Sequence, residues 1–142
     1  MEPVTLEGLP KNPLLLIDSA PIIYVLEDHR EFAAVFRPVF EAHAQRLARF
    51  AVTTVTLAEV LTGPLADRNE VLAERYRSTM RSWFVVDLDA EIAECAARLR
   101  ASSKLKLADA VQAASALAIG ADALITHDRD FSALQDLPIL GV

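Results

Sequence analysis

The chain has 142 residues, of which 53% are hydrophobic and only 6% aromatic, and its formal net charge is −6 at pH 7. This length predicts a single domain, residues 1–142, with a core of its own. The negative charge argues against a protein that holds nucleic acid along a broad basic surface, because such binding needs many Lys and Arg contacts to phosphate. Cys95 is the only cysteine, which excludes an internal disulfide and a cysteine-based metal site.

We expect a cytoplasmic location, because a lone cysteine is typical of a reducing compartment. The segment Met1–Glu7 has neither the basic nor the apolar region of an export signal. No stretch of the sequence approaches the roughly 18 to 20 apolar residues that a spanning helix needs. The sequence therefore indicates neither export nor a membrane.

The first third of the chain predicts one strand and two helices. The apolar run 14–17 is typical of a buried strand. A helix over 19–26 follows, with the Ser19 hydroxyl as its N-cap. Residues 31–49 are also expected to be helical, with apolar side chains along one side, although Pro38 should kink this helix or divide it in two.

The middle of the chain continues the alternation of strands and helices. Residues 50–53 predict the second strand and residues 83–86 the third. Between them we expect a short helix over 56–61, which Gly63–Pro64 ends, and then a longer charged helix over 67–81.

The last third predicts two more helices, over 91–102 and 108–119, with Gly120 ending the second. Strands are expected over 123–126 and, at an edge, over 139–140. No internal repeat or Gly/Ser-rich linker interrupts this order. Strands that alternate with helices predict an α/β fold, a doubly wound parallel sheet of roughly five strands flanked by helices.

Four acids stand where this fold would bring them together. Asp18 follows the first strand, Glu59 lies in the helix after the second strand, Asp109 opens an alanine-rich helix, and Asp128 follows the fourth strand. The carboxyl ends of parallel strands meet at the edge where open α/β folds bind ligands. Bare carboxylates gathered there repel one another unless a cation joins them. Oxygen ligands without cysteines or paired histidines favour Mg²⁺ or Mn²⁺ over Zn²⁺.

Each acid also has a purely structural explanation. Asp18 can cap the first helix, Asp109 gains from the dipole of its helix, and Asp128 can begin a turn. Glu59 is the hardest to explain in this way, because a charged carboxylate among apolar neighbours needs a partner or a water-filled cleft. The four acids taken together favour a metal-binding site. Structural roles of single residues do not explain why acids should gather at the same edge of the sheet.

Motifs spaced along the chain carry a family resemblance. They are Leu14–Ala20, Thr54–Val60, Leu105–Ala110 and Gly120–Asp122 leading into Thr126–Phe131. In this order they resemble the motifs of PIN-domain nucleases, and most closely those of the VapC-like toxins of bacterial type II toxin-antitoxin pairs. The resemblance covers nearly the whole chain. It implies a five-stranded parallel sheet, a divalent metal, cleavage of single-stranded RNA, a homodimer, and a cognate antitoxin protein as partner.

The resemblance also assigns residues, motif by motif. The first three acidic positions of the family correspond to Asp18, Glu59 and Asp109. The fourth falls on Asp128 or Asp130, and we favour Asp128. Thr126 matches the hydroxyl residue that often precedes this acid, whereas His127 stands where Asn or a small residue is more usual, and we leave it out of the catalytic set.

We therefore predict a divalent-metal-dependent endoribonuclease, the toxin of a toxin-antitoxin pair. The ion would be Mg²⁺ or Mn²⁺, bound by Asp18, Asp109 and Asp128. Glu59 would take part directly or through water, and Ser19 and Thr126 would orient the carboxylates or the water. The chemistry expected is hydrolysis of an RNA phosphodiester by a metal-activated water, with the developing charge stabilised by the ion.

Two further features have open interpretations. A basic group precedes Asp109 and could guide a phosphate backbone, although a solvated helix face is the simpler explanation. Its members are Arg98, Arg100, Lys104 and Lys106. A homodimer could use the apolar stretch 32–40 as its contact surface.

Rival functions remain at this stage. A phosphate-accepting domain could use Asp18 as its acceptor, but segment 126–131 lacks the lysine that such domains normally need near a late strand end. A binding module could keep the fold and hold RNA or protein without cutting. A solitary housekeeping nuclease could share every motif with a toxin.

Overall fold

A single parallel sheet runs through the computed structural model, which describes all of residues 1–142. Its strands lie in the order β3-β2-β1-β4-β5, and every neighbouring pair is parallel. They are β1 (Leu14–Ile17), β2 (Arg49–Thr53), β3 (Phe84–Val86), β4 (Ala123–Ile125) and β5 (Ile139–Leu140). The predicted α/β fold with a doubly wound five-stranded sheet is confirmed.

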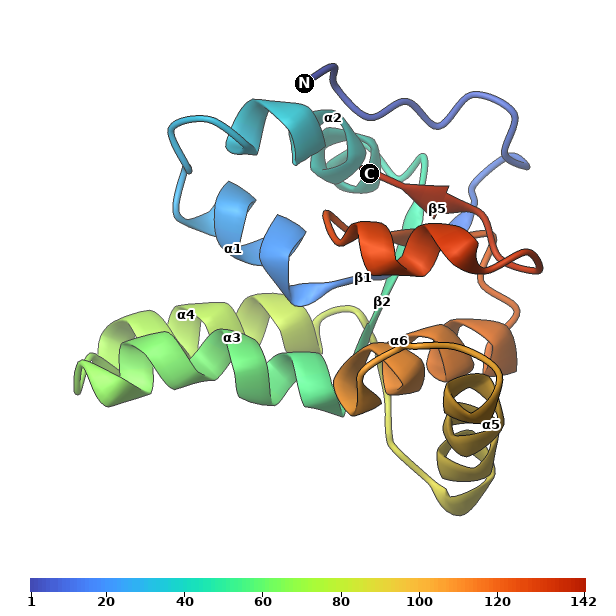
Figure 1. Ribbon diagram of the computed structural model, residues 1–142. Helices are drawn as coiled ribbons and strands as arrows, with labels where there is room; N and C mark the ends of the chain where they lie inside the picture. Colours follow the sequence, from blue (N-terminus) through green and yellow to red (C-terminus); the bar gives the residue numbers. More distant parts are fainter.

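Helices cover both faces of the sheet (Figure 1). They are α1 (Ser19–Leu26), α2 (Ala33–Ala44), α3 (Thr54–Ala66), α4 (Glu70–Arg81), α5 (Ala90–Ala101), α6 (Leu107–Ala118) and the short 3-10 helix η1 (Arg129–Ala133). One core joins Leu15 and Ile17 to side chains of α1, α2, α3 and α4, and the other joins Leu16 to α5, α6 and Phe131. Successive strand residues point to opposite faces, so a sheet that is covered on both sides needs continuous apolar runs such as 14–17.

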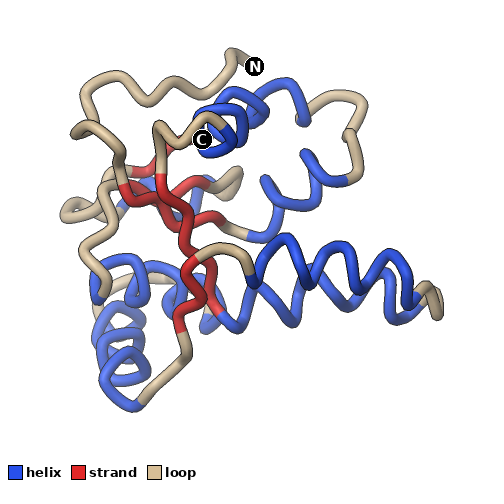
Figure 2. Tube along the Cα trace, turned by 180° about the vertical axis from the view of Figure 1, so that it is seen from behind, coloured by secondary structure: helices blue, strands red, loops and turns tan.

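Helices α3 and α4 lie side by side and project together beyond the sheet (Figures 1 and 2). The prediction that Gly63–Pro64 ends the first of these helices is wrong, because α3 continues to Ala66. Pro64 removes one backbone donor, but it lies close to the end of the helix and is buried. The chain then closes with hydrogen bonds from the N–H groups of Asp67 and Asn69 to the carbonyls of Gly63 and Pro64, at 3.1 and 2.8 Å. Packing of α3 against α4 therefore outweighs the low helix propensity of Gly63–Pro64.

Helix α2 is shorter than the range 31–49 and is not divided by Pro38. Before it, the ring Nδ1 of His29 accepts hydrogen bonds from the N–H groups of Glu31 and Phe32, at 3.2 and 3.1 Å, which fixes a turn that the helical pattern did not reveal. After it, Arg46 takes a left-handed backbone conformation, with φ of 62°, and the helix cannot continue. Two turns therefore flank the helix within the predicted range.

The start of α1 differs from the prediction by one residue. The N-cap is Asp18 and not Ser19, and the Asp18 carboxylate accepts a hydrogen bond from the Ser19 N–H at 2.9 Å. The stop after α6 is as predicted, since Gly120 takes φ of 65°. The remaining predicted elements match the structure in kind, with ends that shift by up to three residues.

The stretch 32–40 is part of the core. Val35, Phe36 and Val39 are buried against the sheet, and Phe32 and Phe40 pack against the same cluster. The suggestion that this stretch forms a dimer surface is therefore wrong, because its apolar side chains are used within one chain. None of the helices combines the length and the apolar character that crossing a bilayer requires.

The order of the strands places a switch point between β1 and β4. From β1 the chain moves outward through β2 and β3 on one side, and then returns to build β4 and β5 on the other. Connections on the two sides leave the sheet in opposite directions, so a crevice forms beyond the carboxyl ends of the two central strands. Asp18 follows β1 and Thr126 follows β4, so both lie at this crevice.

Candidate active site at the carboxyl edge of the sheet

A cleft of about 430 Å³ lies at the switch point. Its lining residues come from α1, α3, α6 and the segment after β4. They are Asp18, Ser19, Ala20, Tyr24, Glu59, Asp109, His127, Asp128 and Arg129. The structure thus brings together the four acids that the sequence singled out.

Asp18 lies at the bottom of this cleft, with 8% of the residue exposed. Its Oδ1 accepts hydrogen bonds from the Ser19 N–H and from Nε2 of Gln112, both at 2.9 Å. Its Oδ2 accepts one from the Thr126 hydroxyl at 2.8 Å. The Asp18 N–H donates to the Ile125 carbonyl at 2.9 Å, so the two central strands fix both the main chain and the side chain of this residue.

Asp109 lies in the first turn of α6, whose N-cap is Lys106. Partial burial, which is the largest cause, and the negative charges of Asp128, Asp18 and Asp130 together raise the pKa of its carboxyl group to about 6, while Lys106 acts in the opposite direction. A carboxyl group with this pKa is placed where negative charge is poorly compensated. The position in the helix alone would favour a charged carboxylate, so burial and the neighbouring acids outweigh the helix dipole here.

Asp128 and Asp130 both approach Asp109. Carboxylate oxygens of the three residues lie within 4.8 Å of one another. Asp128 lines the cleft and is partly buried, its N–H donating to the Thr126 hydroxyl oxygen at 3.1 Å, whereas Asp130 is exposed. The Asp128 carboxylate also caps η1, because it accepts a hydrogen bond from the Asp130 N–H at 2.9 Å. The same residue therefore both caps a helix and lines the cleft. Asp18 is outside this trio, although it is near enough to raise the pKa of Asp109.

Glu59 stands at the mouth of the cleft on the exposed side of α3. Desolvation of its carboxyl group raises its pKa, the charge of Asp18 adds to this, and the Ser19 side chain acts in the opposite direction. Glu59 is the only exposed residue among the four predicted acids that line the cleft, and the charge of Asp18 reaches it.

One wall of the cleft is aromatic. The Tyr24 hydroxyl and Nδ1 of His127 are 3.0 Å apart, and the Phe32 ring packs on His127 with centroids 4.4 Å apart. Burial raises the pKa of Tyr24, with a further contribution from the charge of Glu31. His127 is thus held by its neighbours on this wall.

The residues of the cleft fit a hard divalent cation. Their donors are carboxylate and hydroxyl oxygens, the ligands that Mg²⁺ and Mn²⁺ prefer. None of the three ion pairs of the molecule includes an acid of the cleft. Burial and the neighbouring acids raise the pKa of Asp109, and Lys106 offsets this only in part. Asp109, Asp128 and Asp130 offer one compact set of oxygens for an ion, and Asp18 and Glu59 lie beside it.

The basic residues ahead of Asp109 are spread out. Arg98 is exposed on α5, where it forms an i,i+4 pair with Glu94 at 3.7 Å, and Arg100 and Lys104 are exposed as well. Of these four basic residues, only Lys106 lowers the pKa of Asp109. Arg129 is the only cationic residue in the lining of the cleft, and the sequence did not single it out.

The sequence analysis also missed a buried polar group behind the acids. It consists of Gln112 on α6 with Thr53 and Thr56 at the junction of β2 and α3. The sequence could have pointed to Gln112, because it is the one large polar residue on the alanine-rich face of its helix and lies one turn after Asp109. Tyr24 gave no such signal, because an aromatic residue in an apolar helix is ordinary.

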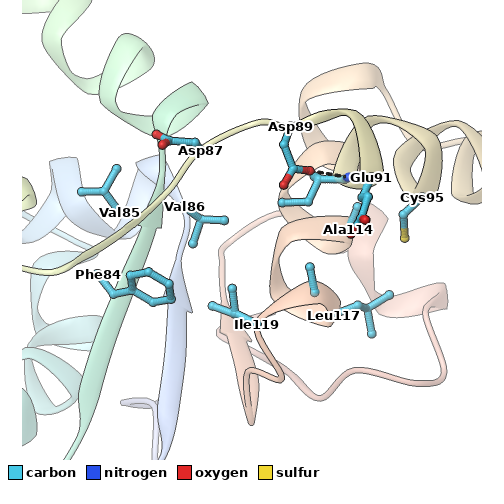
Figure 3. Close-up of a pocket in the computed structure, with 12 residues that line it drawn as sticks. Phe84, Val85, Val86, Asp87, Asp89, Glu91, Cys95, Ala114, Leu117 and Ile119 are labelled. Carbon is cyan, nitrogen blue, oxygen red and sulfur yellow. Dashed lines mark hydrogen bonds between the residues drawn. The ribbon is translucent and has the colours of Figure 1, made fainter.

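A larger cavity, of about 610 Å³, lies elsewhere (Figure 3). It is formed beside the edge strand β3 by apolar side chains of β3, α5 and α6, including Phe84, Val86, Ile92 and Leu117. Asp87 and Asp89 in the loop between β3 and α5, and Glu91 in the first turn of α5, also line it. We call this the β3 groove. It contains no cluster of acids comparable to that of the cleft.

Known structures share this architecture. A toxin-antitoxin complex from Klebsiella pneumoniae contains a chain that is 27% identical, with a TM-score of 0.68 over 87% of this chain and 94% of that one. VapBC-1 from nontypeable Haemophilus influenzae is 21% identical, with a TM-score of 0.70 over 89% and 96%. VapC20 from Mycobacterium tuberculosis, described as a toxin that cleaves the sarcin-ricin loop, is 16% identical, with a TM-score of 0.67 over 84% and 93%. No curated protein sequence matches the chain.

The sequence itself matches a family. The PIN domain model matches residues 15–137, which include all four acids of the cleft. The resemblance to VapC-like nucleases is thereby confirmed together with the fold. The chain belongs to the PIN domain family.

Proposed function

We propose that the protein is a Mg²⁺- or Mn²⁺-dependent endoribonuclease and the toxin of a toxin-antitoxin pair. The observation that carries the proposal is the group of acids at the switch point, which receives no ion pair from the protein. Burial and the neighbouring acids together raise the pKa of Asp109 in this group to about 6. Such a group is stable only with protons or a cation. The family supports a nuclease, and a divalent ion supplies what nuclease chemistry needs.

The residues would divide the work as follows. Asp18, Asp109 and Asp128 would hold the ion, and Asp130 lies close enough to Asp109 to replace or assist Asp128. A bound divalent cation lowers the pKa of water and offsets charge on the phosphate. Glu59, at the solvent side of the cleft, would accept a proton from an entering water. Ser19 and Thr126 would keep the Asp18 carboxylate in place.

The proposed substrate is single-stranded RNA. The cleft is open at the protein surface, and Arg129 and Lys106 stand at or near the acids, where they could contact phosphate oxygens on either side of the cleaved bond. The overall charge of −6 gives no broad electrostatic attraction, so we expect recognition to depend on a few contacts and on RNA shape. VapC20, a structural relative, is described as cleaving an RNA loop.

The deciding experiment is cleavage of total cellular RNA by purified protein with Mg²⁺, Mn²⁺ or EDTA, alongside Asp18→Asn. Asn retains a side-chain oxygen that can cap α1, so the variant should fold. We expect discrete fragments that require the ion and disappear in the variant, while Asp67→Asn, at an exposed position outside the cleft, cleaves normally. Absence of cleavage with every ion on a broad RNA panel would favour the binding-module alternative.

A cognate antitoxin is the proposed protein partner. Structures of relatives include complexes described as toxin-antitoxin or VapBC assemblies. The alternative is a solitary PIN-fold housekeeping nuclease, and the two differ in their genes. A short adjacent reading frame whose product co-purifies with the chain and blocks cleavage would establish the toxin, whereas its absence would leave the solitary nuclease.

We also propose a homodimer, now with a different surface. Phe84 is 54% exposed, and Leu88 and Leu117 are 47% and 39% exposed, so a set of large apolar side chains meets solvent along or near the β3 groove. The outer side of β3 has no strand partner. A second copy would cover this surface, which is the usual reason for an exposed apolar patch. The cytoplasmic location and the single domain remain predictions of the sequence.

A further inference from the structure

Gln112 is the largest of the buried polar side chains near the acids. It lies on α6 with 1% of the residue exposed, among alanines that pack against the sheet. Burying an amide is unfavourable unless it is hydrogen-bonded, so an apolar residue of similar size would suit this helix face better if only packing mattered. Packing alone therefore does not explain why a glutamine occupies this buried position.

Its hydrogen bonds give the explanation. Nε2 donates to Asp18 Oδ1 at 2.9 Å and to the Thr56 hydroxyl oxygen at 2.7 Å, and Oε1 accepts from the Thr53 hydroxyl. Both amide hydrogens are used. The orientation of the amide is also fixed, because an ionised carboxylate can only accept and so must face the nitrogen.

These contacts tie together the elements that carry the acids. Asp18 ends β1, Thr56 lies one turn before Glu59 on α3, and Gln112 itself lies one turn after Asp109 on α6. One side chain thus connects β1, α3 and α6 at the bottom of the cleft. A change in its length or polarity acts on three acid-bearing segments at once.

Gln112 also makes the two oxygens of Asp18 unequal. Oδ1 accepts from both Ser19 and Gln112, whereas Oδ2 accepts only from Thr126. A carboxylate oxygen has about two lone-pair sites, so Oδ1 is filled and Oδ2 keeps one for a further ligand. A neutral amide achieves this without cancelling charge, whereas Lys or Arg at the same place would weaken the attraction for a cation.

We propose that Gln112 is a positioning residue, which fixes the Asp18 carboxylate so that Oδ2 receives the ligand of the cleft and which sets α3 against α6. This inference rests on the proposed metal-dependent function of the cleft. Partners of this kind behind metal ligands are typically responsible for about 10–100-fold in metal affinity or activity.

The test compares Gln112→Met, which keeps the length of the side chain without its donors, with Gln112→Asn, whose amide is too short to reach all its partners. Ser115→Ala is the matched control, because Ser115 is buried one turn away on the same helix and its hydroxyl has no hydrogen-bond partner. Mn²⁺ affinity is measured by calorimetry without RNA, kcat and KM are measured with RNA, and folding is followed by circular dichroism.

We expect both Gln112 variants to fold, to bind Mn²⁺ about tenfold more weakly and to lose kcat by a similar factor, with KM for RNA unchanged, while Ser115→Ala resembles the wild type. Folded variants with wild-type Mn²⁺ affinity and kcat would overturn the proposal. Failure of both variants to fold would also overturn it, because the amide would then serve the fold and not the carboxylate.

The readouts separate this inference from the proposed function. A wild-type protein that binds Mn²⁺ but cuts no RNA contradicts the ribonuclease, and the Mn²⁺ affinities still judge Gln112. A wild-type protein that binds no Mn²⁺ contradicts the metal site. In that case crystal structures of the wild type and Gln112→Met decide, and an Asp18 carboxylate with the same orientation in both would overturn the role of Gln112.

Discussion

The cleft and the β3 groove differ in the kind of partner that each would bind. The groove is larger, about 610 Å³ against about 430 Å³, and its exposed side chains are mainly apolar. The cleft is smaller and polar, and several of its carboxyl groups lie close together without forming an ion pair with the protein. An exposed apolar surface is stabilised when another apolar surface covers it, whereas neighbouring carboxylates are stabilised by protons or by a metal ion. Unsatisfied charge, and not volume, therefore distinguishes the candidate active site.

The largest effect is expected from Asp109→Asn. The change preserves shape but removes a charge from the centre of the acid trio, so cleavage should fall by about 10²–10³-fold or more. Single-turnover cleavage with saturating Mn²⁺ measures it. The control, Asp136→Asn, alters an exposed loop acid outside the cleft and should cut at the wild-type rate. Normal cleavage by folded Asp109→Asn would remove this residue from the mechanism.

The groove should respond to a different change. Phe84→Asp places a charge where a large apolar side chain is exposed, and should weaken dimerisation by about thirtyfold, the equivalent of about 2 kcal/mol of lost apolar burial. Sedimentation at graded concentrations measures this, and Mn²⁺ affinity should stay unchanged. Val71→Asp, at another exposed apolar position, is the control. A wild-type protein that sediments as a monomer would contradict the proposed surface and the dimer together.

A smaller effect is expected from Thr126→Val. Valine keeps the shape of this buried residue but removes the hydroxyl that donates to Asp18 Oδ2 and accepts from the Asp128 N–H. Mn²⁺ affinity should fall about tenfold, with the fold retained. Thr79→Val on α4, at a half-buried position outside the cleft, is the matched control. Equal affinities in both variants would show that the hydroxyl is unimportant to the site.

The smallest effect concerns stability in EDTA. The folded-state pKa of Asp109, about 6, lies above the unfolded value near 4, so the folded protein binds this proton more tightly. Its stabilising contribution is present below about pH 4 and is lost as the pH rises through about 6. Asp109→Asn should therefore melt at a higher temperature than the wild type above pH 6, and the gap should close toward pH 4. A gap that is independent of pH, or of opposite sign, would contradict the raised pKa.

The sequence predicted the sheet well because its strands are continuous apolar runs, as sheets covered on both faces require. It predicted the acids because each follows a strand or lies near the start of a helix at one edge. It failed at Pro64, where packing between α3 and α4 outweighs a local helix-breaking signal, and at His29, whose ring replaces a more usual cap. Gln112 was missed for another reason. Its partners come from segments far apart in the chain, and only the folded structure brings them within hydrogen-bonding distance.

The raised pKa of Asp109 has a consequence for energetics. Near pH 6 about half of the metal-free molecules carry a proton on this carboxyl group. An incoming cation must displace that proton, so ion uptake and proton release are one coupled exchange. The apparent binding heat should then depend on the ionisation heat of the buffer near pH 6, and this dependence should largely vanish near pH 8. The cleft would exchange a proton for a metal ion, and the pH of this exchange depends on the burial of Asp109 and on the acids around it.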